Sequence, residues 1–425
     1  MLKKIFLLFF SFPIIIYAHT LTELFEALKK HSQTKSDDIM IEKTHIYQEM
    51  ANSKLYPTIN LFAKYDNYSS PTGMIPVPPN ELMPMVKKPN IAQPFSYNIY
   101  REGIALSMPV FVKSIFTMAD KAKAMQKSAK AKKYINLLQN EALIVGSNAN
   151  YLYLEALKKA LSTKERSLLE TKKTLKIKVD NGRSPTSSLY KINDGLNQIN
   201  IAKNNIELQE KKVISTIQSL TGIKLDKPAN MQITFKLKSK DIDSLKPLKE
   251  KIQADKLNIK AQKEKLYPAV FAHGSYTYSQ GEAYNNYKNV DEKYGDVGVT
   301  INIPLLTLNQ YDDIKAAKLE VKSSEIELQK LTDELRAKAQ MLEESLPLLN
   351  NSILLYEQSI KEKLKLLKIA KLNYNNKRLS TEEYLRYEDD VVSAKANLHK
   401  VKAQKIQTQM QLAVIYANNI EEMVR

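Results

Sequence analysis

The sequence predicts a mainly α-helical chain with a small β part, built from two copies of one structural plan. Three observations support this fold class. Glycine occurs only 10 times in 425 residues, which leaves few positions for tight turns and favours long elements. Short motifs recur along the chain at a constant offset. Two stretches of 72 residues each (181 − 109 and 376 − 304) carry no strong helix stop apart from their ends.

The first 18 residues have the pattern of an export signal. Lys3 and Lys4 precede an apolar run from Ile5 to Tyr17, and Ala18 supplies a small residue before His19. This arrangement predicts a secretory signal peptide over residues 1–18. The run is too short to span a bilayer as a helix, which takes about 20 apolar residues.

The repeat is visible in two sets of matching residues. The segment from Gly103 to Pro109 recurs in pattern from Gly298 to Pro304, an offset of 195 (304 − 109). Asn181 and Arg183 recur as Asn376 and Arg378 at the same offset. A constant offset through unlike elements indicates an internal duplication. We therefore expect one structural repeat over 19–230 and a second over 231–425.

Each repeat begins with a helix and contains a pair of alternating segments. In the clearest segment Ile104, Leu106 and Met108 share one face, as expected for a strand with one apolar face. About ten residues is also the length that a tilted strand needs to cross a bilayer. Two pairs cannot close a barrel alone, so a membrane barrel would require several copies of the chain. The alternative is a half-buried sheet in a soluble protein. The predicted strands are about 58–68, 97–108, 269–278 and 294–303.

Long helices with 3,4-spaced apolar residues follow each strand pair. This spacing predicts antiparallel coiled-coil hairpins, and Lys203, Glu210 and Lys363 are polar breaks in the seams. In the first repeat we expect a helix at 110–180, a turn at 181–187 and a helix at 188–220. In the second we expect helices at about 241–266 and 305–375, a turn at 376–382 and a helix at 383–417.

The composition argues against several functions. The net charge is +18 (64 − 46), but the lysines are scattered along helical stretches without interleaved stacking aromatics, so nucleic-acid binding is not expected. The chain has no cysteine, and its five histidines show no metal-ligand spacing. No nucleophile elbow or phosphate loop is present. We therefore expect no catalytic residues, no metal, no cofactor and no enzymatic activity.

Taken together, these features resemble the outer-membrane efflux protein family, the TolC-like outer-membrane factors. The resemblance covers essentially the whole mature chain and depends on the arrangement of the doubled strand pairs and hairpin turns. It implies a homotrimer in the outer membrane of a Gram-negative bacterium, in which each chain gives four strands to a shared twelve-stranded barrel. It also implies a periplasmic α-barrel of coiled coils that docks a periplasmic adaptor and an inner-membrane pump.

The same resemblance assigns roles to the hairpin turns. Arg378-Leu379-Ser380 matches an Arg-Leu-Ser turn that meets the adaptor in many multidrug-type members, and the first repeat has Arg183-Ser184-Pro185 in its place. The resemblance also implies an acidic ring that narrows the channel just past the second turn, for which Glu382 or Glu383 is the candidate, while Arg386 stands where a second acid is expected. Three carboxylates brought together in such a ring would attract cations. The expected adaptor-docking residues are Asn181, Gly182, Arg183, Ser184, Asn376, Lys377, Arg378, Leu379 and Ser380.

Three functions remain open on the sequence alone. The first is a passive duct of a tripartite efflux system. The second is a channel dedicated to type I protein secretion, and the third is a periplasmic coiled-coil structural protein without a pore. The exported substrate is not visible in the sequence.

Overall fold

A computed structural model describes residues 19–88 and 90–424, apart from the side chains of Thr381 and Glu382. The predicted signal peptide at 1–18 lies outside the described residues. The described chain forms two compact units. The sheet unit contains 40–130 and 247–328, and the hairpin unit contains 19–39, 131–246 and 329–424. Each unit contains residues from both predicted repeats, so the division into units does not test the boundary between the repeats. That boundary stays a prediction.

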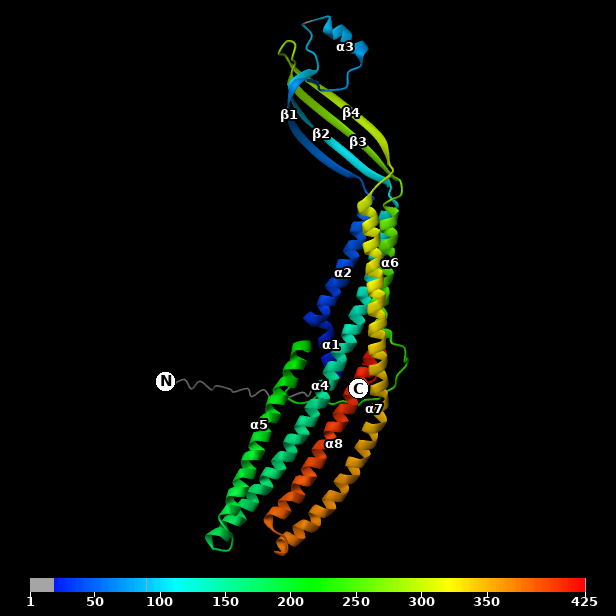
Figure 1. Cartoon of the computed structure of the whole chain (residues 1–425). Coiled ribbons are helices and arrows are strands. Elements are labelled where there is room, and N and C mark those ends of the chain that lie inside the picture. The colour runs from blue at the N-terminus through cyan, green and yellow to red at the C-terminus, as the bar shows by residue number, and fades with distance from the viewer. Residues whose placement is uncertain (1–18, 89, 425) are drawn as a thin grey trace, which may run out of the picture. The chain divides into compact units, whose positions relative to one another are not determined.

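A four-stranded antiparallel sheet dominates the sheet unit (Figure 1). The strands follow one another in chain order, so β1 and β4 form the two edges, and neither has a second strand partner among the described residues. The strands are β1 (Thr58–Gly73), β2 (Phe95–Phe111), β3 (Ala269–Glu282) and β4 (Asn289–Asn302).

The register gives the sheet one apolar and one polar face. The row Ile59–Leu106–Gly274–Val297 runs across all four strands on one face. The side chain of Val297 is 93% exposed, so this apolar face is open to solvent in the single chain. The polar face carries the row Lys64–Arg101–Ser279–Glu292, in which Arg101 pairs with Asp66 at 2.9 Å. The alternation predicted from the sequence is therefore present.

The two strand connections pack against each other. β1 continues to Gly73, beyond the predicted end of the strand, and the Pro-rich connection contains the short helix α3 (Pro79–Val86). Asn285 of the β3–β4 connection donates through Nδ2 to the carbonyl of Ile91 at 2.9 Å and accepts from the backbone N–H of Gln93 at 3.1 Å. These contacts between residues almost 200 positions apart hold the connections together.

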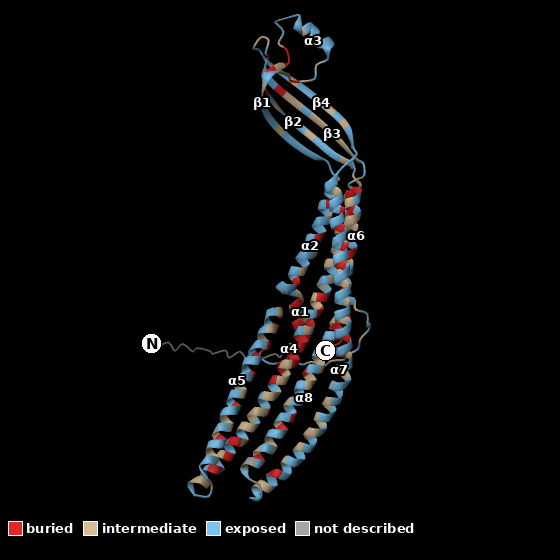
Figure 2. Ribbon diagram, in the orientation of Figure 1, coloured by how far each residue is buried: buried red, intermediate tan, exposed pale blue. Residues whose placement is uncertain are grey.

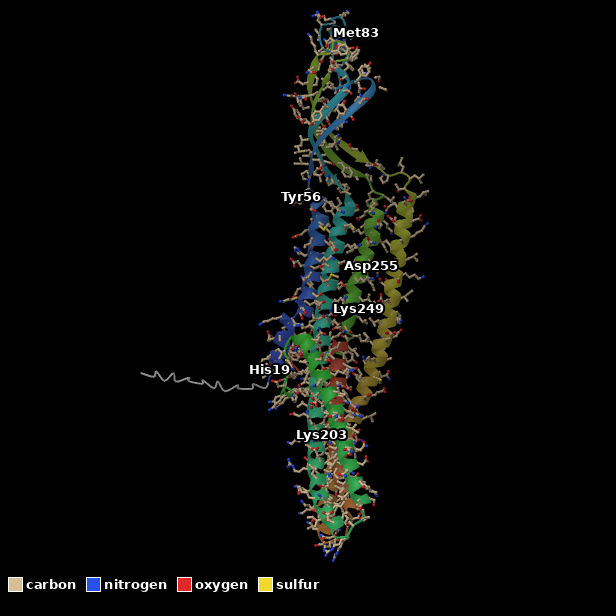
Figure 3. The ribbon with its side chains drawn as sticks, turned by 90° about the vertical axis from the view of Figure 1, so that its left-hand side faces the viewer. His19, Tyr56, Met83, Lys203, Lys249 and Asp255 are labelled. Atoms are coloured by element: carbon tan, nitrogen blue, oxygen red, sulfur yellow. The ribbon has the colours of Figure 1, made fainter. Side chains whose placement is uncertain are left out.

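Helical segments complete the sheet unit. They are α6 (Lys246–Glu264), most of α2 (Ser32–Ser53), and the first turns of α4 (Lys113–Asp180) and α7 (Leu308–Asn375). Polar contacts join neighbouring helices. Ser324 of α7 donates to Asp255 of α6 at 3.1 Å, and Asp255 is labelled in Figure 3. Thr117 of α4 donates to the buried Glu264 of α6.

The helical hairpins of the hairpin unit have equal dimensions. Helices α4 and α7 each contain 68 residues, and α5 (Ser187–Thr221) and α8 (Thr381–Ile415) each contain 35. This equality confirms the internal duplication as a property of the fold. The hydrophobic core lies where α1 (Leu21–Lys30) meets α4, α5 and the C-terminal residues, and Figure 2 shows the buried positions there. Leu24, Leu138, Ile217 and Ile420 are fully buried in it.

The polar breaks in the predicted seams form ion pairs between the paired helices. Lys203 of α5, labelled in Figure 3, pairs with Glu165 of α4. Glu210 of α5 pairs with Lys158 of α4 at 2.8 Å. In the second hairpin Lys363 lies 3.4 Å from Asp390. The breaks therefore supply specific pairing between the helices where apolar contacts are interrupted.

Within 19–88 and 90–424, none of the helices has an apolar stretch long enough to span a bilayer.

Candidate functional site at the hairpin turns

The two hairpin turns have the same backbone geometry. In the first, the N–H groups of Asn181, Gly182 and Arg183 donate to the carbonyls of Ile177, Val179 and Lys178. In the second, Asn376, Lys377 and Arg378 donate to carbonyls at the same relative positions. Both turns place their middle residue in the left-handed region, with φ of 67° at Gly182 and 61° at Lys377. A helix that ends this way normally has glycine there, because a Cβ is strained in this conformation.

We expect Lys377→Gly to stabilise the second turn. Glycine removes the strain of the left-handed residue, and its greater freedom in the unfolded chain offsets part of this gain. The net increase in unfolding free energy should be about 0.5–1 kcal/mol. The matched change Gly182→Ala should destabilise the first turn by about 1 kcal/mol or slightly more. Thermal melting of the two variants should show shifts of opposite sign, and a lower melting temperature for Lys377→Gly would contradict the assignment.

The helices that follow the turns begin differently. Ser380 caps α8 in a capping box, because its Oγ accepts from the N–H of Glu383 at 3.2 Å and its own N–H donates to the Glu383 carboxylate at 2.9 Å. Hydrogen bonds from the Ser380 hydroxyl and N–H hold the pKa of Glu383 below its usual range. At α5 the N-cap residue Thr186 forms no side-chain capping hydrogen bond within the described residues. Glu383, a predicted constriction residue, therefore has a local structural role, and the side chain of Glu382 lies outside the described residues.

Between the two hairpins lies a groove of about 1050 Å³, which we call the tip groove. Its floor is apolar and includes Leu168, Leu175, Ile192, Ile199 and Leu385. Asp389 is the one acid among the described residues that line the groove, and it pairs with Lys164. The groove is consequently electropositive. Its basic lining residues are Lys164, Lys178, Arg183, Lys191, Lys377 and Arg386.

An ion pair across the tip groove joins the first hairpin to the second, and contacts of Tyr384 beside the groove stabilise the second hairpin. Lys164 of α4 pairs with Asp389 of α8 across the groove. Tyr384 of α8 is 8% exposed, stacks on Tyr374 at 4.9 Å between ring centroids, and donates to Glu388 at 2.7 Å. Burial and the hydrogen bond to Glu388 raise the pKa of Tyr384 to about 12, so the phenol stays protonated and keeps donating at any physiological pH.

The structure brings some of the predicted site residues together and leaves others apart. Arg183, Ser184, Lys377, Leu379, Ser380 and Arg386 line the tip groove. Asn181, Gly182, Asn376 and Arg378 lie in the turns but do not line it. Sequence reasoning missed Lys164, Lys178, Lys191 and Asp389, which lie on the helices above the turns. They carry no motif, since the groove depends on how two hairpins 195 positions apart lie next to each other.

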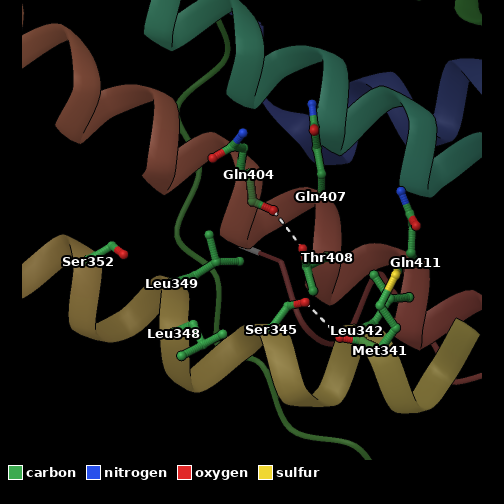
Figure 4. Close-up of a pocket in the computed structure, with 10 residues that line it drawn as sticks. All are labelled: Met341, Leu342, Ser345, Leu348, Leu349, Ser352, Gln404, Gln407, Thr408 and Gln411. Carbon is green, nitrogen blue, oxygen red and sulfur yellow. Dashed lines mark hydrogen bonds between the residues drawn. The ribbon is translucent and has the colours of Figure 1, made fainter.

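A second groove, of about 430 Å³, lies between α7 and α8 (Figure 4). Gln404, Gln407 and Gln411 of α8 line it together with Leu348 and Leu349 of α7. Pro347 is in the same stretch of α7, which continues through it as one helix. This groove is lined only by neutral residues, so it offers no charge-based recognition, and the tip groove is the stronger candidate.

No protein-family model matches the sequence, and no curated protein sequence matches it. Several solved structures share the fold. The Campylobacter jejuni CmeC outer membrane channel aligns with a TM-score of 0.76 at 16% identity, over 94% of this chain and 85% of that one. The outer membrane protein VceC of Vibrio cholerae aligns with a TM-score of 0.73 at 14% identity, over 94% and 96%. The Neisseria gonorrhoeae MtrE outer membrane channel aligns with a TM-score of 0.73 at 14% identity, over 94% of this chain and 89% of that one. The predicted resemblance is thus confirmed for the fold.

Proposed function

We propose that the chain is one subunit of a trimeric outer-membrane channel that acts as a passive export duct of a tripartite efflux system. The supporting observation is the four-stranded sheet with two unpaired edges and an exposed apolar face. Unpaired edges cannot remain open in lipid, because each free N–H and C=O would lack a partner. Pairing β1 of one copy with β4 of the next removes both edges. Three copies would then give a barrel of twelve strands (3 × 4).

The two faces of the sheet suit this arrangement. The row that contains Ile59, Leu106 and Val297 would face lipid. The row that contains Lys64, Arg101 and Glu292 would face a water-filled lumen. Membrane barrels have this alternation of apolar outward and polar inward residues. The likeness to solved outer-membrane channels supports the same function.

The experiment that tests this function is conductance of the purified protein in a planar lipid bilayer. We expect heat-modifiable trimers in outer-membrane fractions and stable conductance steps from the reconstituted protein. A soluble periplasmic dimer with no conductance would contradict the proposal and favour a structural coiled-coil protein. Loss of one secreted polypeptide on deletion, without any change in efflux, would instead indicate a channel dedicated to protein secretion.

We further propose that the turns and the tip groove dock a periplasmic adaptor, which connects the channel to an inner-membrane pump. The groove offers an apolar floor between basic side chains, which fits an amphipathic helix with acidic flanks. The residues proposed to contact the adaptor include those of the turns, such as Arg378, and the groove lysines Lys178 and Lys191. The pump would supply the energy, and the channel itself would do no chemistry.

Charge reversal in the groove should weaken adaptor docking. We expect Lys178→Glu to lower docking about tenfold at low salt, and less at high salt, since an attractive charge becomes repulsive and salt screens both. Arg378→Ala should also reduce docking, while trimers stay intact. The readout is cross-linking to the adaptor from a photoreactive residue in place of Ser188, which also lines the groove, compared at equal amounts of trimer. Lys176→Glu is the matched control, because Lys176 is on the same helix but outside the groove. Equal loss in the control, or no loss at Lys178, would count against the groove as the docking site.

A further inference from the structure

In the sheet unit, α2 and α7 each carry exposed apolar residues. α2 leads into β1 and α7 follows β4, so the two helices adjoin the two edge strands of the sheet (Figure 1). We infer that α7 of one copy packs along α2 of the next as an antiparallel pair, and that the charges beside the contact select this partner. We call this contact the α2–α7 interface. The inference rests on the proposed function, which pairs β1 with β4 of a neighbouring copy.

The first turns of α7 have one side packed against their own chain and the other side open. Val321 and Ser324 are buried, and Ser324 donates to α6. The opposite side carries Leu308, Leu319 and Ile326, which are 69%, 67% and 61% exposed. These three share one face because the intervals of 11 and 7 residues (319 − 308 and 326 − 319) are close to whole helical turns. They form an apolar stripe that points away from the buried side.

α2 presents a shorter apolar stripe. Ile46 and Met50 are 45% and 54% exposed, whereas Thr44 and Ala51 on the other side of the helix are buried. Both stripes lie close to the sheet. α2 ends five residues before β1 (58 − 53), and α7 begins six residues after β4 (308 − 302). If β1 and β4 of neighbouring copies pair, the two stripes lie side by side at similar distances from the sheet.

Charged residues flank the stripe of α2 on both sides. Seen from its N-terminal end, a right-handed helix turns clockwise along the chain, which gives a stripe a clockwise and an anticlockwise flank. The clockwise flank of α2 is basic and carries the exposed Lys43 and Lys54. The anticlockwise flank is acidic and carries the exposed Glu42 and Glu49.

On α7 the order of the charges is reversed. The clockwise flank is acidic and carries the exposed Asp312, Asp313 and Glu320. The anticlockwise flank is basic and carries the exposed Lys315 and Lys322. Asp312 and Glu320 also contact lysines of their own chain, at 3.1 and 3.5 Å, but their side chains stay 73% and 61% exposed. They are therefore open to a second partner.

Antiparallel packing turns this reversal into charge complementarity. One helix is turned end over end relative to the other, so the two clockwise flanks meet each other and the two anticlockwise flanks meet each other. Lysines of α2 then face acids of α7 on one side, and acids of α2 face lysines of α7 on the other. A parallel α2–α7 pair, or an antiparallel pair of two α2 helices, would bring like charges together. Flanking charges set partner and orientation in coiled coils in the same way.

Introduced cysteines test the contact directly, because the chain has none of its own. Ile46 lies 12 residues before β1 (58 − 46), which places it level with about position 314 of α7 (302 + 12). We combine Ile46→Cys in turn with Asp312→Cys, Lys315→Cys and Leu319→Cys, which surround this level on the open side. We expect a disulfide between copies in at least one combination, seen as trimers that survive denaturation until they are reduced.

Ile46→Cys with Glu325→Cys is the control, because Glu325 pairs with Lys256 of its own α6 at 2.9 Å and lies outside the stripe. This combination should give no linked trimers. A disulfide within one chain would leave the mass at that of a monomer. Linked monomers alone, or conducting trimers without linkage at any of the three positions, would overturn the inference.

Charge reversal tests whether the flanks select the partner. Lys43→Glu with Lys54→Glu places acids opposite acids. It should raise the protein concentration needed for trimers about tenfold at low salt, and less at high salt. Adding Asp312→Lys and Asp313→Lys restores opposite charges and should recover most of the loss. Weakening that these additions do not reverse would count against selection by charge.

Lys123→Glu with Lys263→Glu is the matched control, because it makes the same change of charge on α4 and α6 and should leave assembly unchanged. Equal weakening by this pair would also overturn the inference. Conductance recorded on the same preparations separates the two proposals. Conducting trimers without linkage reject the α2–α7 interface alone, whereas linkage between copies without conductance supports the interface and rejects the channel.

Discussion

Replacing Gly103 by alanine is expected to force the two central strands of the sheet apart and to destabilise the sheet strongly. Gly103 of β2 pairs with Thr277 of β3 at the centre of the sheet. A Cβ at Gly103 would lie 2.3 Å from the carbonyl oxygen of Tyr276 and 3.0 Å from the Cα of Thr277. Both are backbone atoms of β3, which no side-chain rotation can move away. The strands β2 and β3 would therefore have to separate locally. We expect a loss of about 3 kcal/mol in unfolding free energy, together with loss of trimers and of conductance.

Gly274→Ala is the matched control for this experiment. Gly274 lies on the same strand pair, opposite Leu106, but its added Cβ would meet the carbonyl oxygen of Asp296 at an ordinary 3.4 Å. This variant should assemble and conduct like the wild type. Wild-type amounts of conducting Gly103→Ala trimer would show that the sheet does not have the described register.

Replacing Glu141 by glutamine is expected to stabilise the hairpin unit above neutral pH. Glu141 of α4 is 2% exposed, and its Oε2 has no hydrogen-bond partner among the described residues. Burial, together with the nearby charge of Glu421, raises the pKa of Glu141 from 4.5 to about 8. Lys29 opposes this shift but is already paired with Glu421 at 2.7 Å. Glutamine keeps the shape of the side chain but cannot ionise.

The sign of the pH dependence follows from the raised pKa. Between pH 4.5 and 8 the unfolded chain releases this proton and the folded chain retains it, so stability falls as the pH rises and levels off above about 8. At pH 7 the penalty is about 3 kcal/mol. We therefore expect Glu141→Gln to melt close to the wild type at pH 4.5 and several degrees higher at pH 8. The exposed Glu155→Gln on the same helix is the control, and an unchanged pH profile in Glu141→Gln would refute the buried-acid interpretation.

The repeat and the local structure could both be predicted from the sequence. A repeat is visible as matching residues at a constant offset, and local structure depends on near neighbours. The alternation at Ile104, Leu106 and Met108 predicts one apolar face of the sheet, and the 195-residue offset indicates the duplication. The polar residues Lys203 and Lys363 were recognisable as breaks in the seam. Their partners Glu165 and Asp390 could not be identified, because the facing helix carries several acids and the sequence does not say which of them lies opposite each lysine.

Only part of the candidate site could be predicted from the sequence. The turns were found from Asn181 and Asn376, since helix stops are local signals. The tip groove was not, because its lysines and Asp389 become neighbours only when two hairpins lie next to each other. The same holds for the role of Glu383, whose carboxylate caps its own helix through Ser380.

By itself the sequence determined the fold class, the two strand pairs and the helical hairpins, because the periodicity of apolar residues and the scarcity of glycine act within a few turns of chain. Only the tertiary structure decided which charges face the tip groove, which glycine cannot accept a Cβ, and which glutamate is buried. These properties depend on distances between segments far apart in the chain, and no local pattern encodes them.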